Sequence, residues 1–348
     1  MKKFIDKDLF IIAEISANHN GSISNAIKLI NMAKQNGANA VKLQTYTPDM
    51  MTIKENKIKF KIRKGLWKNY NLWDLYNLGQ TPISWHKRLF NHAKSKGIKI
   101  FSTPFSEDAI KILEKINCPA YKIASFEMND YNLVKSAAKT KKPLILSTGM
   151  SNLDEIDKAV RIVKNNGCKD LTLLYCVSNY PSTSRDFNLN YIRKFKEKFN
   201  CKVGLSDHSL GSEVARYSLI AGATVFEKHI ALPNQKKGLD LKFSLKGSQL
   251  KKYCEDLIKT HSLIKNKNLN RTNEELENKI FRRSIYAVKN IAKGDFFTKE
   301  NIKTFRPNKG LSASFYLDIL KKKSPINIKK HYPLPGTLQK LILKRKVK

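Results

Sequence analysis

Two histidines occupy similar places in the sequence, each at the end of a short apolar run. His208 follows GLSD, and His229 lies in FEKHIA. If these runs are neighbouring parallel strands of a barrel, their ends lie side by side and the two imidazoles converge. Imidazole suits Mn, Zn or Fe, and a carboxylate or water can complete a divalent site. A single buried histidine is more often a satisfied core residue, but a pair at adjacent strand ends favours a metal site.

Two lysines within otherwise apolar runs indicate an anion site. Lys42 lies in AVKLQT and Lys122 in AYKIAS. A lysine inside a core is costly unless it meets an anion or changes its protonation state. Small hydroxyl side chains end the same or nearby runs, namely Thr103, Ser125, Ser147, Thr148 and Ser206. Together with main-chain N–H groups near Gly149, they can hold a phosphate or carboxylate. Alternatively, the lysines point outward and extend their amines to water.

Two carboxylates are candidates for proton transfer or ligand binding. Glu14 lies in the apolar run FIIAEI, and Glu127 follows YKIASF. One could activate water or bind a metal, and the other could hold hydroxyl groups of a sugar. The alternative is a surface carboxylate, which is less plausible for Glu14 because of its apolar surroundings.

These residues need strands whose ends meet, and the sequence offers eight candidates. Each is rich in apolar residues: 10–15, 40–45, 98–103, 120–125, 143–148, 171–176, 202–207 and 224–230. Such runs are typical of strands buried on both faces of a parallel sheet. Helical segments lie between them, such as 107–117 and 24–37, the latter with Ser24 or Asn25 as its N-cap.

Eight strand–helix units predict a (β/α)8 (TIM) barrel, whose active site lies at the C-terminal ends of the strands. The alternative is a doubly wound open sheet. Its usual phosphate motif, G-x-G-x-x-G after the first strand, is absent, since this turn reads SANHNGS.

Changes in composition along the sequence predict three parts. Residues 1–265 form the barrel, 266–281 a polar helical linker, and 282–348 a small separate domain. An insertion at 49–87 is rich in lysine and then in aromatic residues, and could form a lid or a packing helix.

The chain carries 66 Lys and Arg against 29 Asp and Glu, a formal net charge of +37. This charge could mark a nucleic-acid-binding protein on a barrel scaffold. However, only 11 of the basic residues are Arg, the lysines are scattered, and no nucleic-acid motif is recognised. Compositional drift is the favoured interpretation, and we expect no nucleic-acid partner.

Other patterns limit the cellular setting. No apolar run approaches the roughly 18 residues of a membrane span, and the charged N-terminus does not read as a signal peptide. The five cysteines are odd in number and include no C-x-x-C pair. We therefore expect reduced thiols in a cytoplasmic protein without a membrane partner.

The ordered motifs resemble the family of N-acetylneuraminic acid synthases, which condense phosphoenolpyruvate with an amino sugar. The matching stretches are AEISANHNGS, AVKLQTYTPD, FSTPFS, YKIASFE, LSTGM, GLSDHS, FEKHIAL and RRSIYAVKNIAKGDFFTKENI with RPNKGLS. The last of these resembles the antifreeze-like (SAF) domain of that family. Within the family, the aromatic insertion, KIASFEMND, LDLKFSL and GLSASFYLDIL are most similar to the pseudaminic acid synthases. Synthases of neuraminic or legionaminic acid remain the alternative, and an inactive barrel that serves only assembly is a further one.

The resemblance implies that phosphoenolpyruvate, 2,4-diacetamido-2,4,6-trideoxy-L-altrose and water give pseudaminate and phosphate. It implies Mn2+ or Mg2+ on His208 and His229, and Glu127 as the base for the attacking water. Substrate carboxylate would be held by Lys122, Ser125 and Ser206. Phosphate would be held by Lys42, Thr103 and Ser147. The sugar would meet Glu14, Gln44, Tyr180 and Asp240.

Two implied roles need separate mention. Arg306, in RPNKGLS, would reach the N-acetyl group from the SAF domain of a partner chain, giving a domain-swapped homodimer. Ser178, in CVSNYP, stands where sialate synthases have Asn. Its role is therefore open, although a hydroxyl can still donate a hydrogen bond to a carboxylate.

Overall fold

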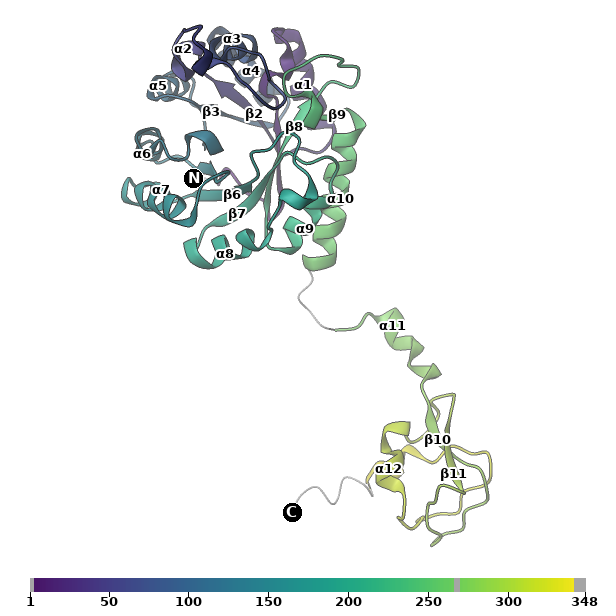
Figure 1. Ribbon diagram of the computed structural model, residues 1–348. Coiled ribbons are helices and arrows are strands. Elements are labelled where there is room, and N and C mark those ends of the chain that lie inside the picture. Colours follow the sequence, from purple (N-terminus) through teal and green to yellow (C-terminus); the bar gives the residue numbers. More distant parts are fainter. Residues whose placement is uncertain (1–2, 266–269, 341–348) are drawn as a thin grey trace. The chain divides into compact units, whose positions relative to one another are not determined.

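The computed structural model describes residues 3–265 and 270–340, and its first part is a closed barrel of eight parallel strands (Figure 1). The strands are β1 (Phe10–Glu14), β2 (Ala40–Thr45), β3 (Lys99–Pro104), β4 (Tyr121–Ile123), β5 (Leu144–Ser147), β6 (Leu171–Cys176), β7 (Lys202–Asp207) and β8 (Val225–Ala231). Each pairs with the next, and β1 also pairs with β8. The predicted TIM barrel is confirmed, and closure of the sheet rules out the doubly wound alternative.

Amphipathic helices surround the strands in the order expected of alternating β–α units. They are α1 (Ile23–Gln35), α4 (Ile83–Ser95), α5 (Glu107–Lys115), α6 (Tyr131–Lys139), α7 (Leu153–Asn165), α8 (Asn190–Phe199), α9 (Glu213–Ile220) and α10 (Ser248–Lys265). The N-cap predicted for α1 was wrong. The N-cap is Ser22 and not Ser24 or Asn25. The Ser22 side chain accepts a hydrogen bond from the Asn25 N–H.

Strand alternation sorts side chains between the inside of the barrel and the helix layer. On β8, Glu227 and His229 line the internal cavity, whereas Lys228 between them lies over the ring of Tyr253 in α10. The apolar core includes Phe226 on the helix-facing side of β8, and Phe10 and Phe101, which share the inner strand faces and pack against Phe4. On β8, register thus separates the charged residue that faces the cavity, Glu227, from the apolar residue that faces the helix layer, Phe226.

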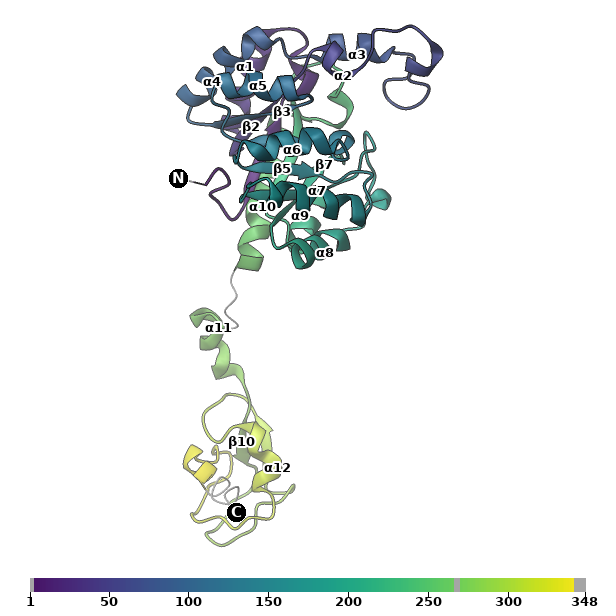
Figure 2. The same cartoon turned by 90° about the vertical axis from the view of Figure 1, so that its left-hand side faces the viewer.

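The segment between β2 and α4 forms a structured insertion. It contains α2 (Pro48–Met51), a 3-10 turn (Ile58–Phe60) and α3 (Leu72–Gly79). In Figure 2 the part that carries α2 and α3 extends outward from the barrel. The predicted insertion, 49–87, overlaps the start of α4, so its last residues belong to the helix layer of the barrel.

The chain folds into two compact units, Met1–Asn266 and Lys267–Lys348. The second has its own apolar core, which includes Ile285, Phe297 and Leu334. Its regular elements are α11 (Asn273–Glu277), the antiparallel pair β10 (Ser284–Ala287) and β11 (Ile302–Phe305), and α12 (Tyr316–Ile319). The predicted linker and C-terminal domain each include residues outside the described ranges. Across residues 3–265 and 270–340, no helix has the length and apolar character needed to cross a membrane.

Candidate active site

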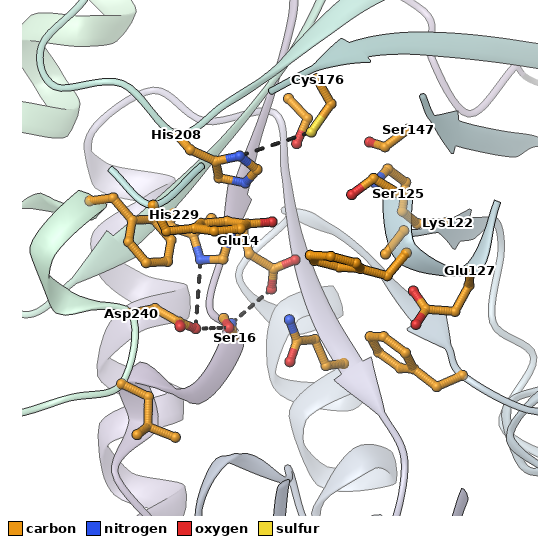
Figure 3. Close-up of a pocket in the computed structure, with 18 of the residues that line it drawn as sticks. Glu14, Ser16, Lys122, Ser125, Glu127, Ser147, Cys176, His208, His229 and Asp240 are labelled. Atoms are coloured by element: carbon orange, nitrogen blue, oxygen red, sulfur yellow. Dashed lines mark hydrogen bonds and ion pairs between the residues drawn. The ribbon is translucent and has the colours of Figure 1, made fainter. Parts of the chain in front are cut away.

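A cavity of about 340 Å3 opens at the C-terminal ends of the barrel strands (Figure 3). It gathers most of the residues selected from the sequence, namely Glu14, Lys42, Gln44, Lys122, Ser125, Glu127, Ser147, Tyr180, Ser206, His208, His229 and Asp240. These residues come from seven strands or the turns that follow them. Strand ends far apart in the chain therefore meet at one place, as barrel geometry requires.

Four selected residues do not line this cavity, and one of them, Thr148, donates its hydroxyl instead to the Leu174 carbonyl at 3.2 Å. Thr103 lies behind the cavity and accepts a hydrogen bond of 2.8 Å from the Lys42 ammonium. Ser178 lies beside it, with its hydroxyl 2.9 Å from that of Ser125. Arg306 is an exposed residue of the C-terminal unit, just after β11.

Four charged side chains form a buried cluster on the inner barrel wall. Lys42 pairs with Glu14, its neighbour across the β1–β2 register. Lys42 and Lys122 also face one oxygen of Glu227, at 3.7 and 3.6 Å. The other Glu227 oxygen is buried without a hydrogen-bond partner among the described residues. We call Glu14, Lys42, Lys122 and Glu227 the inner cluster.

Burial and neighbouring charges act against each other in the inner cluster. Burial lowers the pKa of Lys122 below its ordinary value. Burial also lowers the pKa of Lys42, but Glu14 and Glu227 outweigh it and raise this pKa. For Glu227, burial raises the pKa, while the two lysines outweigh it and hold the pKa below its usual range. Lys122 therefore has only a long contact to one carboxylate oxygen, and an arriving anion can compete for its ammonium group.

The two histidines face each other across the ends of β7 and β8, with ring centroids 5.4 Å apart. His208 Nδ1 lies 3.0 Å from the Val177 carbonyl, so it donates there and leaves Nε2 as the lone-pair nitrogen. His229 Nδ1 is buried without a hydrogen-bond partner and lies 3.8 Å from an Asp240 oxygen. Burial, followed by the nearby positive charges, holds the pKa of His229 well below its ordinary value.

The lowered pKa and the unpartnered Nδ1 of His229 fit a metal site, because neutral imidazole is the form that binds metals. For His208, burial lowers the pKa, but Cys176 and the Val177 carbonyl outweigh it and raise this pKa. Figure 3 places His208, His229 and Asp240 on one side of the cavity. In the described part of the chain, no group of three or more His, Cys, Asp or Glu residues is arranged to hold a metal ion. A metal on the two histidines would therefore take its remaining ligands from water or substrate.

Glu127 ends a 3-10 turn, Ser125–Glu127, that follows β4. One of its carboxylate oxygens is buried without a hydrogen-bond partner. Burial raises the pKa of Glu127 to about 7, while the Lys122 charge partly opposes this shift. A carboxylate with such a pKa is suited to accept a proton at neutral pH.

Close packing of β4, β5 and their turns leaves a small polar recess. Gly149 has φ +35°, and a Cβ there would lie 2.4 Å from the Ser125 Cβ. Only glycine allows this approach. The buried Ser147 hydroxyl nearby has no hydrogen-bond partner within the described chain. A free donor beside Ser125 and Lys122 suits a carboxylate or phosphate group.

Comparison with known proteins identifies the barrel. The NeuB family model matches residues 29–268, and the SAF domain model matches residues 282–337. The chain belongs to the NeuB family.

Named relatives of this NeuB family chain match it over almost their whole length. It is 44% identical to the pseudaminic acid synthase of Campylobacter jejuni (serotype O:2), over 93% of this chain and 94% of that one. It is 41% identical to the pseudaminic acid synthase of Helicobacter pylori, over 93% and 96%. The crystal structure of an N-acetylneuraminic acid synthetase from Leptospira borgpetersenii, in complex with citrate, superposes with a TM-score of 0.70. It is 30% identical and covers 78% of this chain and 90% of that chain.

Several cavity residues of this NeuB family member were missed from the sequence. Glu227 could have been found, because it lies two residues before His229 and so shares its strand face. Ser16 follows β1, and its hydroxyl donates to Asp240. Phe243 packs on His229 with ring centroids 4.8 Å apart. Ser16 and Phe243 lie in turns, where no periodic pattern marks the direction of a side chain.

Proposed function

We propose that this chain is a pseudaminic acid synthase. It would condense phosphoenolpyruvate with 2,4-diacetamido-2,4,6-trideoxy-L-altrose and water, giving pseudaminate and phosphate for surface glycans. The observation that carries the proposal is the extended identity to two pseudaminic acid synthases, which exceeds the identity to the neuraminic acid synthetase. The chemistry of the cavity agrees with it, since ammonium groups, hydroxyls and imidazoles meet beside one carboxylate of raised pKa.

The inner cluster and its hydroxyls would hold phosphoenolpyruvate. Lys122, with Ser125 and Ser206, would bind the carboxylate. Lys42, with Thr103 and Ser147, would bind the phosphate. Support comes from the long contacts of Lys122 to Glu227 and from the unpartnered Ser147 hydroxyl, which leave binding capacity for an anion. Fixed charges of this kind stabilise a polyanion without reorganising during the reaction.

The C3 carbon of phosphoenolpyruvate would attack the aldehyde carbon of the sugar, so that the C2=C3 π electrons form the new bond and positive charge develops at C2. Glu127 would accept the proton of the water that then adds at C2. Loss of phosphate from the resulting tetrahedral carbon would follow by C–O cleavage. The position of Glu127 across the cavity from the histidines in Figure 3 supports a role at the opposite face of the reacting carbon. Glu14, Gln44, Tyr180 and Asp240 would hold the sugar.

The two histidines would hold a divalent cation, Mn2+ or Mg2+. When bound, such a cation supplies Lewis acidity to the aldehyde oxygen of the open-chain sugar. Two observations support this assignment. The Nδ1 of His229 has no hydrogen-bond partner, and the Nδ1 of His208 bonds the Val177 carbonyl, so that its Nε2 is available.

The proposal includes a domain-swapped homodimer in which Arg306 of the partner subunit meets the N-acetyl group of the sugar. Its support is the family resemblance of RPNKGLS and the exposure of Arg306 in this chain. We further propose a cytoplasmic location, because phosphoenolpyruvate is a cytoplasmic metabolite. The five cysteines are present as free thiols, which agrees with a reducing compartment.

One assay tests the reaction directly. Purified protein is incubated with phosphoenolpyruvate, Mn2+ and one sugar at a time, and phosphate release is followed. We expect release with the diacetamido-trideoxy-altrose that greatly exceeds release with N-acetylmannosamine, and a product with the mass of pseudaminate. Phosphate release that depends on neither sugar would refute the synthase, and preference for N-acetylmannosamine would indicate a neuraminate synthase.

A further inference from the structure

The cavity has two unlike walls. The strand ends contribute charged and hydroxyl groups, whereas the insertion between β2 and α4 contributes an almost wholly apolar surface. The insertion residues that line the cavity are Met51, Ile62, Trp67, Leu72, Leu75 and Tyr76. We call these six residues the insertion wall.

Hydrogen bonds fix the insertion wall in place. The Trp67 indole N–H donates to the Leu239 carbonyl at 3.0 Å, which ties the insertion to the chain after β8. The Trp67 ring also packs against Tyr180, with centroids 5.4 Å apart. Within the insertion, the Asn71 amide donates to the Glu55 carbonyl at 2.8 Å. Trp67 is therefore presented to the cavity by contacts from outside its own loop.

The insertion wall is incompletely covered. Ile62, Trp67 and Leu72 are only half-buried, although they stand beside a cavity floor of buried charges. Apolar surface left facing water in a cavity is unfavourable, and it is relieved when an apolar group of a ligand covers it. A ligand that fits both walls must be anionic or polar at one end and apolar at the other.

The sugar of the proposed function has this polarity. Its aldehyde carbon must lie beside phosphoenolpyruvate at the strand ends, which directs C4 and C6 away from the barrel floor. These distant carbons carry an acetamido group and a methyl group, where common hexosamines carry hydroxyls. We propose that the insertion wall, with Trp67 at its centre, binds the C6 methyl and the C4 acetamido methyl and so sets sugar specificity.

This inference rests on the proposed function and adds a cause for its selectivity. A sugar with a hydroxyl at C6 would place a polar group against Trp67 without a partner, which disfavours its binding. Apolar pockets discriminate only moderately against an added hydroxyl, by about 100-fold at most. We therefore expect a graded preference rather than absolute exclusion.

The test compares two sugars and two tryptophans. The sugars are the trideoxy substrate and 2,4-diacetamido-2,4-dideoxy-L-altrose, which keeps the 6-hydroxyl. The variants are Trp67→Ala and, as a matched control, Trp73→Ala. Trp73 lies in the same insertion, but its indole N–H donates to Asp49 and its ring contacts Lys54 rather than the cavity. Each protein is assayed for kcat/KM with both sugars and for KM of phosphoenolpyruvate.

We expect Trp67→Ala to lower the preference for the trideoxy sugar by about 10-fold, because its methyl loses its apolar contact. The KM for phosphoenolpyruvate should stay unchanged, Trp73→Ala should keep the native preference, and Trp67→Phe should restore most of it. If Trp67→Ala does not fold, as judged by thermal unfolding, Leu72→Ala provides the same measurement.

An unchanged preference in a folded Trp67→Ala or Leu72→Ala variant overturns the inference and leaves the proposed function intact. A native enzyme that turns over only sugars with hydroxyls at C4 and C6 overturns both. The two failures are therefore distinguishable from one set of assays.

Discussion

Two groups of buried charges lie on opposite faces of the barrel sheet, and they differ in how completely their hydrogen-bonding groups are satisfied. The inner cluster faces the cavity. The second group, which we call the outer cluster, consists of Asp207, Ser209, Lys228 and Tyr253 and lies between β7, β8 and α10. Glu227 and Lys228 are adjacent in sequence but belong to different clusters, because strand residues alternate between faces.

Every Asp207 oxygen in the outer cluster has partners at hydrogen-bonding distance. One accepts from the N–H and the hydroxyl of Ser209, at 2.9 and 2.6 Å. The other pairs with the Lys228 ammonium at 3.0 Å and accepts from the Tyr253 hydroxyl at 3.3 Å. Lys228 also donates to the Ser209 carbonyl. Such a closed network has no capacity left for a ligand and serves the structure.

The inner cluster, in contrast, contains hydrogen-bonding groups without close partners. Lys122 is 3.6 Å from its carboxylate partner, beyond a good hydrogen bond, and one oxygen of Glu227 has no partner in the described chain. Burial of a charge therefore does not by itself indicate function. What distinguishes the site is unfilled hydrogen-bonding capacity beside a cavity.

The largest expected effect is on catalysis by the inner cluster. Lys122→Met should lower kcat/KM by roughly 1,000-fold or more, because it removes a preorganised charge from the proposed binding site for phosphoenolpyruvate. The fold should keep its stability, since Lys42 still faces Glu227. Phosphate release and thermal unfolding measure the two effects. A large loss of stability in Lys122→Met would indicate that the inner cluster mainly stabilises the fold, as the outer cluster does.

The matching change in the outer cluster should act on stability. Lys228→Met leaves the Asp207 carboxylate buried without its ion pair and should lower the free energy of unfolding by roughly 3 kcal/mol. Denaturant unfolding measures this loss. The KM for phosphoenolpyruvate in the folded fraction should change little. A stable Lys228→Met protein with greatly weakened phosphoenolpyruvate binding would contradict the division between the clusters.

Glu127, like Glu227 of the inner cluster, has a buried oxygen without a hydrogen-bond partner, and we expect it to determine the pH dependence of the reaction. Burial raises its pKa to about 7, so the ionised form that accepts a proton is lost as the pH falls below that value. The kcat/KM should therefore fall about 10-fold per pH unit on the acid side of this midpoint. Glu127→Gln should remove this limb from the residual activity. Persistence of the limb in Glu127→Gln would assign it to another group.

Much of the fold was predictable because buried parallel strands are continuous apolar runs. All eight predicted strands appear: β2, β6 and β7 have the predicted bounds, and the ends of the others differ by at most two residues. The N-cap of α1 was misplaced because SISN offers several capping residues, and tertiary contacts select among them. Strand ends likewise indicated the polar side of the site, since chain direction fixes where they meet.

The apolar side of the site was not predictable in the same way. The sequence indicated only an aromatic insertion at 49–87, which contains Trp67, and the direction of this side chain depends on a hydrogen bond to Leu239, 172 residues away. No local pattern specifies such a contact. Glu227 differs from Trp67, because the sequence FEKH does specify its position. Residues two apart on a strand share a face, so Glu227 lies beside His229.

The smallest expected effect concerns the many lysines that belong to neither cluster. Exposed charges act over a screening length of about 8–10 Å at moderate salt, so they can steer phosphoenolpyruvate but hold it weakly. Raising salt from about 0.05 to 0.5 M should raise the KM for phosphoenolpyruvate by only a few-fold and leave the KM for the uncharged sugar unchanged. Steady-state kinetics at several salt concentrations measure the two KM values.

The same assays with duplex DNA added as a competitor test the alternative. Strong inhibition by DNA, whose log affinity falls with log salt concentration with a slope of several units, would instead indicate that the net charge of +37 binds a polyanion. Without that inhibition, the exposed lysines act as a diffuse field around a site whose proposed binding of phosphoenolpyruvate depends on the open inner cluster.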